Sequence, residues 1–137
     1  MREFDVVVIG GGPGGYVAAI RAAQLGAQVA LVEKDRIGGT CLNRGCIPIK
    51  ALYYSAKNLL AARHAGDFGV NVGNISFDMA KAVERKDGVV KKLVGGVEQL
   101  LKGNGVEVFK GGGFLESAST VRVTKDGRLL SLQDIST

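Results

Sequence analysis

The stretch FDVVVIGGGPGGYVAAIRAAQLGAQVALVEKD, residues 4–35, contains three sequence patterns in succession. Residues 4–10 are a short apolar, β-branched run that stops at glycine, which is typical of a strand buried on both faces of a parallel sheet. Residues 16–27 carry apolar side chains at helical spacing, with Gly26 as a terminator. Residues 28–35 form a second apolar run that ends in acid. The stretch therefore predicts strand, glycine turn, helix and strand, as in an α/β fold.

Glycines at fixed positions join the first predicted strand to the helix. Gly10, Gly12 and Gly15 supply the pattern G-x-G-x-x-G at this point. The pattern gives a tight turn at Gly10, room for a pyrophosphate at Gly12 and close helix–strand packing at Gly15. The helix N-terminus offers phosphate its free N–H groups and the positive end of its dipole. In this context the pattern indicates a dinucleotide site, whereas alone it would be only a glycine-rich turn.

Glu33 stands at the end of the second predicted strand. A carboxylate there is placed to hold the ribose hydroxyls of a dinucleotide, and it disfavours a 2′-phosphate. The glycine pattern and Glu33 together do not distinguish NAD from FAD.

A second glycine-rich stretch, GGTCLNRGCIPIK at residues 38–50, holds the two cysteines of the chain, Cys41 and Cys46. A zinc site needs three or four protein ligands, and the chain adds only one histidine, His64, so no metal site is predicted. The first residues are unlike a secretion signal, and we expect a cytoplasmic protein, in which disulfides are transient and catalytic. A redox couple is therefore the favoured hypothesis.

The spacing of the two cysteines restricts the backbone between them. In a regular helix, residues five apart lie ~7.5 Å apart along the axis and ~140° around it, beyond the ~4.4–6.8 Å Cα separation of a disulfide. Cys41 and Cys46 can bridge only where the backbone departs from a regular helix, which Gly45 and Pro48 make reasonable. Residues 50–66 predict an amphipathic helix, so Cys46 lies near a helix N-terminus, where the positive dipole end favours thiolate over thiol.

The composition bounds the class of protein. With 137 residues, 46% hydrophobic and 23% charged, the chain has the size and balance of about one globular domain. The sequence contains no run of ~18 uncharged apolar residues, which is the length that a membrane-spanning helix needs. The net charge of +5 is scattered among acidic residues without a basic-aromatic stripe, so no nucleic-acid partner is predicted. We interpret the excess charge as solvated surface, or as a complement to an anionic cofactor.

The second half of the chain predicts one long helix and several strands. The helix spans residues 76–106, with Ser76 or Asp78 as its N-cap. Its expected inward-facing residues are Met79, Val83, Val90, Leu93, Val97 and Leu100 or Leu101. The expected strands are residues 106–111, 120–124 and 128–133, the last two forming a hairpin about Lys125, Asp126 and Gly127.

The motif at residues 38–50 carries a resemblance to a known family. With the Gly10–Gly15 turn and Glu33, it resembles the amino-terminal part of the dihydrolipoamide dehydrogenase group of the pyridine nucleotide-disulfide oxidoreductases, whose pattern is close to G-G-T-C-x-N-x-G-C-[IV]-P-[ST]-K. The resemblance extends through residues 66–72, the later helix and residues 106–123, so it covers essentially the whole chain. It implies a partial Rossmann-like FAD-binding domain over residues 1–137, with a parallel sheet, flanking helices and a β-hairpin or meander near the C-terminus.

The resemblance implies FAD as the cofactor, with NAD as a co-substrate. The pyrophosphate would lie on the glycine turn, the adenosine ribose on Glu33 and the adenine against the backbone of Gly113, while Gly39 and Thr40 would line the flavin side. The cofactor-binding residues it implies are Gly10, Gly12, Gly14, Gly15, Glu33, Lys34, Gly39, Thr40, Cys46, Lys50 and Gly113.

The catalytic residues that the resemblance implies are Cys41, Cys46 and Lys50. Cys41 matches the thiol that exchanges with a dithiol substrate, Cys46 the thiol against the flavin, and Lys50 a lysine near the reactive edge of the flavin. The alternative is that Lys50 merely lies on a surface helix turn. The implied substrate is dihydrolipoamide on a lipoyl domain of a 2-oxo acid dehydrogenase or glycine cleavage complex, and the implied whole enzyme is a homodimer.

Two features restrict what the resemblance implies. Ile49 stands where Ser or Thr is usual, which leaves the substrate open, so that a glutathione or mercuric reductase is the alternative parent enzyme. The NAD-binding and interface domains of the family are not expected within residues 1–137. We therefore expect these residues alone to lack activity, and the alternative is a non-catalytic nucleotide-binding module.

Overall fold

The computed structural model describes residues 2–124 and 129–132. The helices are α1 (Pro13–Gln24), α2 (Gly39–Arg44), α3 (Cys46–Arg63), the 3-10 helix η1 (Ala65–Phe68) and α4 (Met79–Gly103). The strands are β1 (Arg2–Phe4), β2 (Val6–Ile9), β3 (Val29–Glu33), β4 (Glu107–Lys110), β5 (Gly113–Ser117), β6 (Thr120–Val123) and β7 (Leu129–Leu132).

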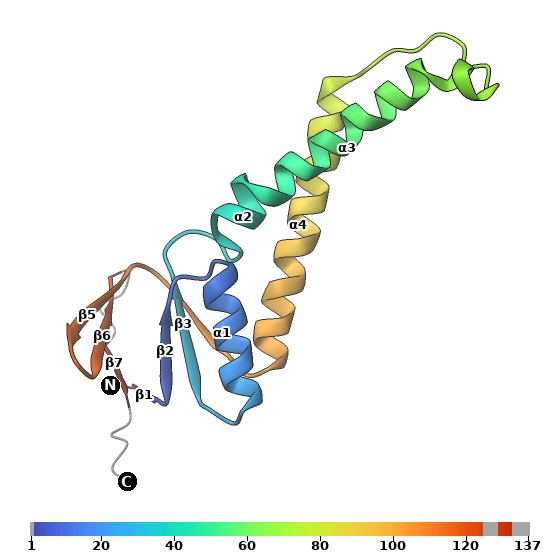
Figure 1. The fold of residues 1–137 in the computed structure, drawn as a ribbon. Coiled ribbons are helices and arrows are strands. Elements are labelled where there is room, and N and C mark those ends of the chain that lie inside the picture. The colour runs from blue at the N-terminus through green and yellow to red at the C-terminus, as the bar shows by residue number, and fades with distance from the viewer. Residues whose placement is uncertain (1, 125–128, 133–137) are drawn as a thin grey trace.

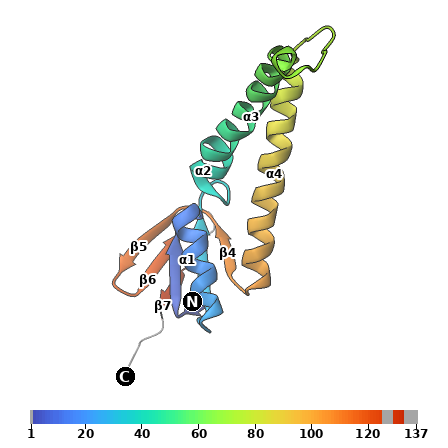
Figure 2. The ribbon, with the colours of Figure 1, turned by 45° about the vertical axis from the view of Figure 1, so that its right-hand side comes forward.

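A parallel sheet in the order β2-β3-β4, with β3 in the middle, forms one layer of the fold (Figures 1 and 2). The predicted strand–turn–helix–strand unit is confirmed as β2, α1 and β3. β3 is buried on both faces, because Val29 and Leu31 pack on the helical side and Ala30 and Val32 pack on the opposite side. This explains its nearly continuous apolar sequence.

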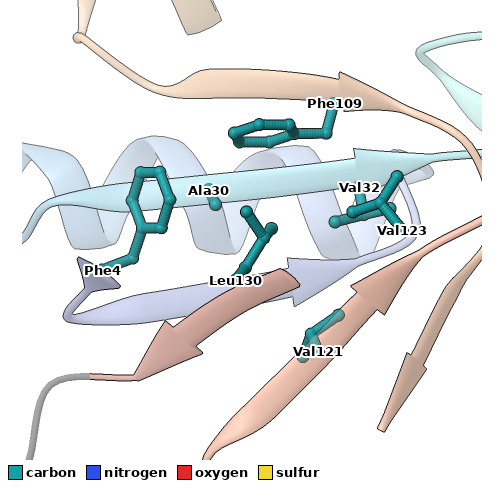
Figure 3. Close-up of a cluster of buried hydrophobic side chains, with 7 residues drawn as sticks. All are labelled: Phe4, Ala30, Val32, Phe109, Val121, Val123 and Leu130. Carbon is teal, nitrogen blue, oxygen red and sulfur yellow. The ribbon is translucent and has the colours of Figure 1, made fainter. Parts of the chain in front are cut away.

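An antiparallel layer covers the opposite side of this sheet. Its strand order is β1-β7-β6-β5, in which β6 pairs antiparallel with both neighbours and β1 pairs parallel with β7. Figure 3 shows the core between the two sheets, made of Phe4, Ala30, Val32, Phe109, Val121, Val123 and Leu130. The rings of Phe4 and Phe109 meet edge to face, with their centroids 5.9 Å apart.

The helical side has its own core. The buried residues there are Ala19, Val29, Leu31, Ile37, Leu101 and Val106. They come from α1, β3, the segment after β3, the end of α4 and the segment before β4, so the helices and the parallel sheet share one packed layer. The expected fold class, a parallel sheet with flanking helices and antiparallel strands near the C-terminus, is confirmed.

A hairpin of α3 and α4 extends away from both sheets (Figures 1 and 2). Asp78 is the N-cap of α4, as predicted, and its carboxylate accepts a hydrogen bond from the Lys81 N–H over 3.1 Å. The inward-facing assignment is wrong for Met79, Val83 and Leu93, which are exposed, whereas the alternative of Leu100 or Leu101 is resolved by Leu101, which is buried. The apolar stripe has the expected helical spacing, but much of α4 lies beyond the sheets that could cover it. None of the helices within residues 2–124 and 129–132 could cross a membrane.

The strand predictions are partly correct. The first predicted strand divides at Asp5 into β1 and β2, and the Asp5 carboxylate accepts a hydrogen bond from the Gln28 N–H over 2.6 Å. The hairpin of β6 and β7 is confirmed, whereas its predicted turn at residues 125–127 and the strand end at residue 133 lie outside the described residues. β5 was not predicted from the sequence.

Adjacent leucines of α4 test how the helical core contributes to stability. Leu101 is fully buried and Leu100 is 56% exposed. We expect Leu101→Ala to lower the free energy of unfolding by about 2–5 kcal/mol, since it leaves a cavity, and Leu100→Ala to lower it by less than about 1 kcal/mol. Chemical denaturation of the two variants measures the difference, and equal losses would contradict this packing.

Candidate functional site

The glycine turn between β2 and α1 brings backbone atoms into close contact. Gly10 has a φ of +103° and donates its N–H to the Val32 carbonyl over 2.7 Å. A Cβ on Gly15 would lie 1.7 Å from the Gly10 carbonyl oxygen. The predicted close packing of helix on strand at Gly15 is therefore confirmed, because no other residue type fits there.

The N-terminus of α1 is open to a ligand. Gly12 is the N-cap and Pro13 is in the first turn, and no side chain caps the helix. A Cβ on Gly14 would meet no atom within 4 Å. The amide groups of the first turn are therefore not taken up by a capping side chain, which is the arrangement that binds phosphate.

The Glu33 carboxylate ties the end of β3 to the glycine turn. Its Oε2 accepts a hydrogen bond from the Gly11 N–H over 2.6 Å, and its Oε1 accepts one from the Asp35 N–H over 2.7 Å. Each carboxylate oxygen keeps a further lone pair that can accept from a hydroxyl group. The sequence predicts a ribose-binding acid here but did not indicate this second, internal role.

A cavity of about 240 Å³ opens beside this carboxylate. Its lining consists of Ile9, Gly10, Val32, Glu33, Lys34, Gly111, Gly112, Gly113 and Phe114. It lies at the carboxyl ends of β2, β3 and β4, where ligands bind in open α/β sheets. Four residues predicted to bind the cofactor, Gly10, Glu33, Lys34 and Gly113, therefore meet around one cavity.

The sequence reading missed other residues of this cavity. Gly111 and Gly112 precede the predicted Gly113, and the Gly111 N–H donates to the Glu33 carbonyl over 2.9 Å. The run of three glycines that begins at the last residue of a predicted strand was the signal that could have found them. Phe114 gave no comparable signal.

The two cysteines lie on either side of a helix break, as their spacing predicts. α2 ends at Arg44 and α3 begins at Cys46, with Gly45 between them at φ −123° and ψ −105°. A Cβ on Gly45 would lie 3.2 Å from the Thr40 carbonyl oxygen, so the small residue lets α3 begin close to α2. Pro48 lies in the first turn of α3, where its missing N–H costs nothing.

The thiols of Cys41 and Cys46 are free in the structure and interact with each other. A side-chain hydrogen bond to Cys46 is the main cause that raises the pKa of Cys41 above its ordinary value. The positive charge of Lys50 acts on Cys41 in the opposite direction. The three residues predicted to be catalytic therefore lie within electrostatic reach of one another.

The remaining predicted residues lie around this break. Thr40 is exposed in the first turn of α2, and Lys50 is exposed on α3. Gly39 contacts the glycine turn, since a Cβ added to it would lie 2.8 Å from the Gly12 Cα. The dithiol region, residues 38–50, and the predicted nucleotide region, which consists of the Gly10–Gly15 turn and Glu33, are thus adjacent in the fold.

A larger cavity does not coincide with these residues. Its volume is about 640 Å³, and it lies between α4, β4 and the segment after β3. Acidic and basic side chains mix along its wall, as in Asp35, Arg36 and Lys91, and neither cysteine reaches it. We therefore place the candidate site at the glycine turn and the dithiol, where the chemistry is concentrated. Within the described part of the chain, no three His, Cys, Asp or Glu residues cluster as metal ligands would.

Two neighbouring glycines of α1 test the backbone contact. We expect Gly15→Ala to cost more than about 3 kcal/mol of stability or to prevent folding, because the new methyl group meets the Gly10 carbonyl. Gly14→Ala has free space and should change stability by no more than about 1 kcal/mol. Thermal unfolding of both variants makes the comparison, and a Gly15→Ala protein as stable as the parent would rule out the contact.

The interaction of the two thiols predicts a pH effect. Cys46→Ala removes the main cause that raises the pKa of Cys41 and leaves Lys50, which lowers it. The thiolate fraction of Cys41 at a given pH therefore rises, and its alkylation profile should move to lower pH. Replacing Lys50 with Met should move the profile to higher pH. Mass spectrometry of the Cys41 peptide after iodoacetamide pulses measures both, and an unmoved profile in Cys46→Ala would disprove the interaction.

Comparison with known proteins agrees with this arrangement. A family model described as pyridine nucleotide-disulphide oxidoreductase matches residues 4–133. The chain is 55% identical over 123 residues to the dihydrolipoyl dehydrogenase of Acholeplasma laidlawii, covering 89% of this chain and 37% of the relative. It is 54% identical over 121 residues to that of Geobacillus stearothermophilus, covering 88% and 26%. The chain thus spans only 26% to 37% of the length of these relatives. Since the family model covers nearly the whole chain, the chain belongs to the pyridine nucleotide-disulphide oxidoreductase family and corresponds to its N-terminal FAD-binding region.

Proposed function

We propose that this chain provides the dithiol and the first part of the FAD cradle in an enzyme that oxidises dihydrolipoamide and reduces NAD. The observation that carries the proposal is the contact between the two regions, in which Gly39, two residues before Cys41, lies against Gly12 of the glycine turn. A reactive thiol pair and a dinucleotide turn would then act on the same bound molecule. The dihydrolipoyl dehydrogenases among the relatives support this substrate.

The residues present fit FAD. The uncapped first turn of α1 suits a pyrophosphate, and the absent side chains at Gly12 and Gly14 leave room for it. The cavity beside Glu33 has a carboxylate for ribose hydroxyls and glycine backbone for an adenine ring. When bound, FAD would take an electron pair from the dithiol and pass it to NAD.

The thiol chemistry follows from exchange at the Cys41–Cys46 pair. With the pair oxidised, one substrate thiolate attacks the Cys41 sulfur, a mixed disulfide forms there, and Cys46 leaves as thiolate. The second substrate thiolate then attacks the substrate sulfur of the mixed disulfide, which releases Cys41. The substrate ends as a disulfide, two electrons reside in the cysteine pair, and two protons leave the substrate thiols.

The two thiols differ in their exposure to solvent. Cys46 is exposed and Cys41 is half-buried. The role of Cys41 as the exchanging thiol therefore rests on the motif, while the position of Cys46 at the start of α3 suits a thiolate leaving group. Lys50, one helical turn further along, adds a positive charge near the pair.

Further parts of the proposal concern the whole enzyme. We infer a homodimer in the cytoplasm whose substrate is carried on a lipoyl domain of a 2-oxo acid dehydrogenase or glycine cleavage complex. Ile49, which replaces the usual hydroxyl residue, is 64% exposed on α3, so it alters the surface near the dithiol. We retain dihydrolipoamide as the substrate because these relatives are named dihydrolipoyl dehydrogenases.

Serine variants of the two cysteines test the proposal in the complete protein that its gene encodes. We expect this protein to be yellow and to gain long-wavelength absorbance on two-electron reduction, because a Cys46 thiolate would donate charge to the flavin. Cys46→Ser should abolish this absorbance. Cys41→Ser should keep it and lose turnover with dithiols. Survival of the absorbance in Cys46→Ser, or a protein that retains no FAD, would refute the proposal.

A further inference from the structure

The segment from Ile37 to Gly39 connects the two regions of the candidate site. The Gly38 N–H donates to the Gly11 carbonyl over 2.8 Å. Gly39, with a φ of +57°, approaches Gly12 so closely that a Cβ would lie 2.8 Å from the Gly12 Cα. The segment therefore rests on the glycine turn through both a hydrogen bond and direct backbone packing.

Asn43 holds this segment from the other side. Its Nδ2 donates to the Ile37 carbonyl over 3.0 Å and to the Gly39 carbonyl over 2.9 Å. An amide nitrogen carries two hydrogens, so both are used. α2 begins at Gly39, and its N-cap, Gly38, provides no side-chain cap. Asn43 is thus a polar clamp from the last turn of a short helix onto the segment that precedes it.

Cys41 lies between these two attachments. It follows Gly39 by two residues and precedes Asn43 by two residues in the same short helix. The contact of Gly39 with Gly12 fixes one end of this turn, and the two hydrogen bonds of Asn43 fix the other end to the same segment. Displacement of Asn43 would therefore release Cys41 relative to the glycine turn.

We propose that Asn43 is a positioning residue that sets the place of the Cys41–Cys46 pair relative to the glycine turn, and thereby relative to the bound FAD. The second part rests on the proposed function, whereas the first part concerns the protein without cofactor. Asn43 does not itself need to touch substrate or FAD in this role.

Asn58 supplies a matched control on α3. Its Nδ2 donates to the Tyr54 carbonyl over 2.8 Å, four residues earlier in the same helix. Asn43 makes a bond of the same local kind to Gly39, but it also reaches Ile37, which lies outside α2. Both asparagines therefore make a hydrogen bond within their own helix, but of the two it is Asn43 that also binds the segment from Ile37 to Gly39.

The first measurement uses Asn43→Asp and Asn58→Asp in the complete protein without added FAD. Aspartate keeps the shape of asparagine but, when ionised, has no hydrogen to donate. We expect backbone amides in the peptide that contains Gly38 to exchange with deuterium at least about tenfold faster in Asn43→Asp, because two hydrogen bonds are lost. Asn58→Asp should exchange there as the parent does. Asn43→Ser, which keeps one donor, should be intermediate and serves if Asn43→Asp does not fold.

The second measurement titrates the same variants with FAD and then reduces them. We expect the dissociation constant for FAD to rise at least about tenfold in Asn43→Asp and the long-wavelength absorbance per bound flavin to fall, while Asn58→Asp matches the parent. A lower melting temperature with unchanged FAD affinity and absorbance would make Asn43 merely structural and would overturn the inference. So would exchange identical to that of Asn58→Asp. If the parent binds no FAD, the proposed function fails, while faster exchange in Asn43→Asp still supports the clamp.

Discussion

The carbonyl oxygen of Gly10 occupies the place where any side chain at residue 15 would have to lie. α1 consequently rests directly on the end of β2, and this contact fixes the height of its first turn above the parallel sheet. Glu33 reaches the same turn through the Gly11 N–H, and the segment before α2 reaches it through the Gly11 carbonyl. The nucleotide region and the dithiol region therefore take their positions from one short stretch of glycine backbone.

The two regions lie close together mainly because glycines, which have no side chain, stand at their points of contact. Gly39 meets Gly12 and Gly45 meets the Thr40 carbonyl at distances that admit no further atom without movement. Polar groups then hold what the glycines allow, as the amide of Asn43 does. Close packing of glycine backbone and hydrogen bonds from polar side chains therefore both position the site.

Local patterns in the sequence predicted the features that depend on neighbouring residues. The strand–turn–helix–strand unit, the break at Gly45 and the Asp78 cap follow from the residue types and their spacing, and the structure confirms them. β5 was not predicted because its two apolar residues, Phe114 and Leu115, are adjacent, so they do not form the alternating pattern of a half-buried strand. Both side chains are exposed in the structure. Periodicity also identified the apolar stripe of α4 but could not tell whether another element covers it. The bonds of Glu33 and Asn43 to backbone depend on the tertiary fold, which no spacing reveals.

Glu33 has an evolutionary consequence. Its carboxylate accepts hydrogen bonds from the Gly11 and Asp35 N–H groups and lines the cavity that we propose for the nucleotide ribose. A lineage that exchanged this acid for a basic residue, to accept a phosphorylated ribose, would lose a tie between β3 and the turn in the same step. Under the proposed role of Glu33, a change of nucleotide preference at this position would therefore also weaken the turn, unless another residue replaced the lost hydrogen bonds.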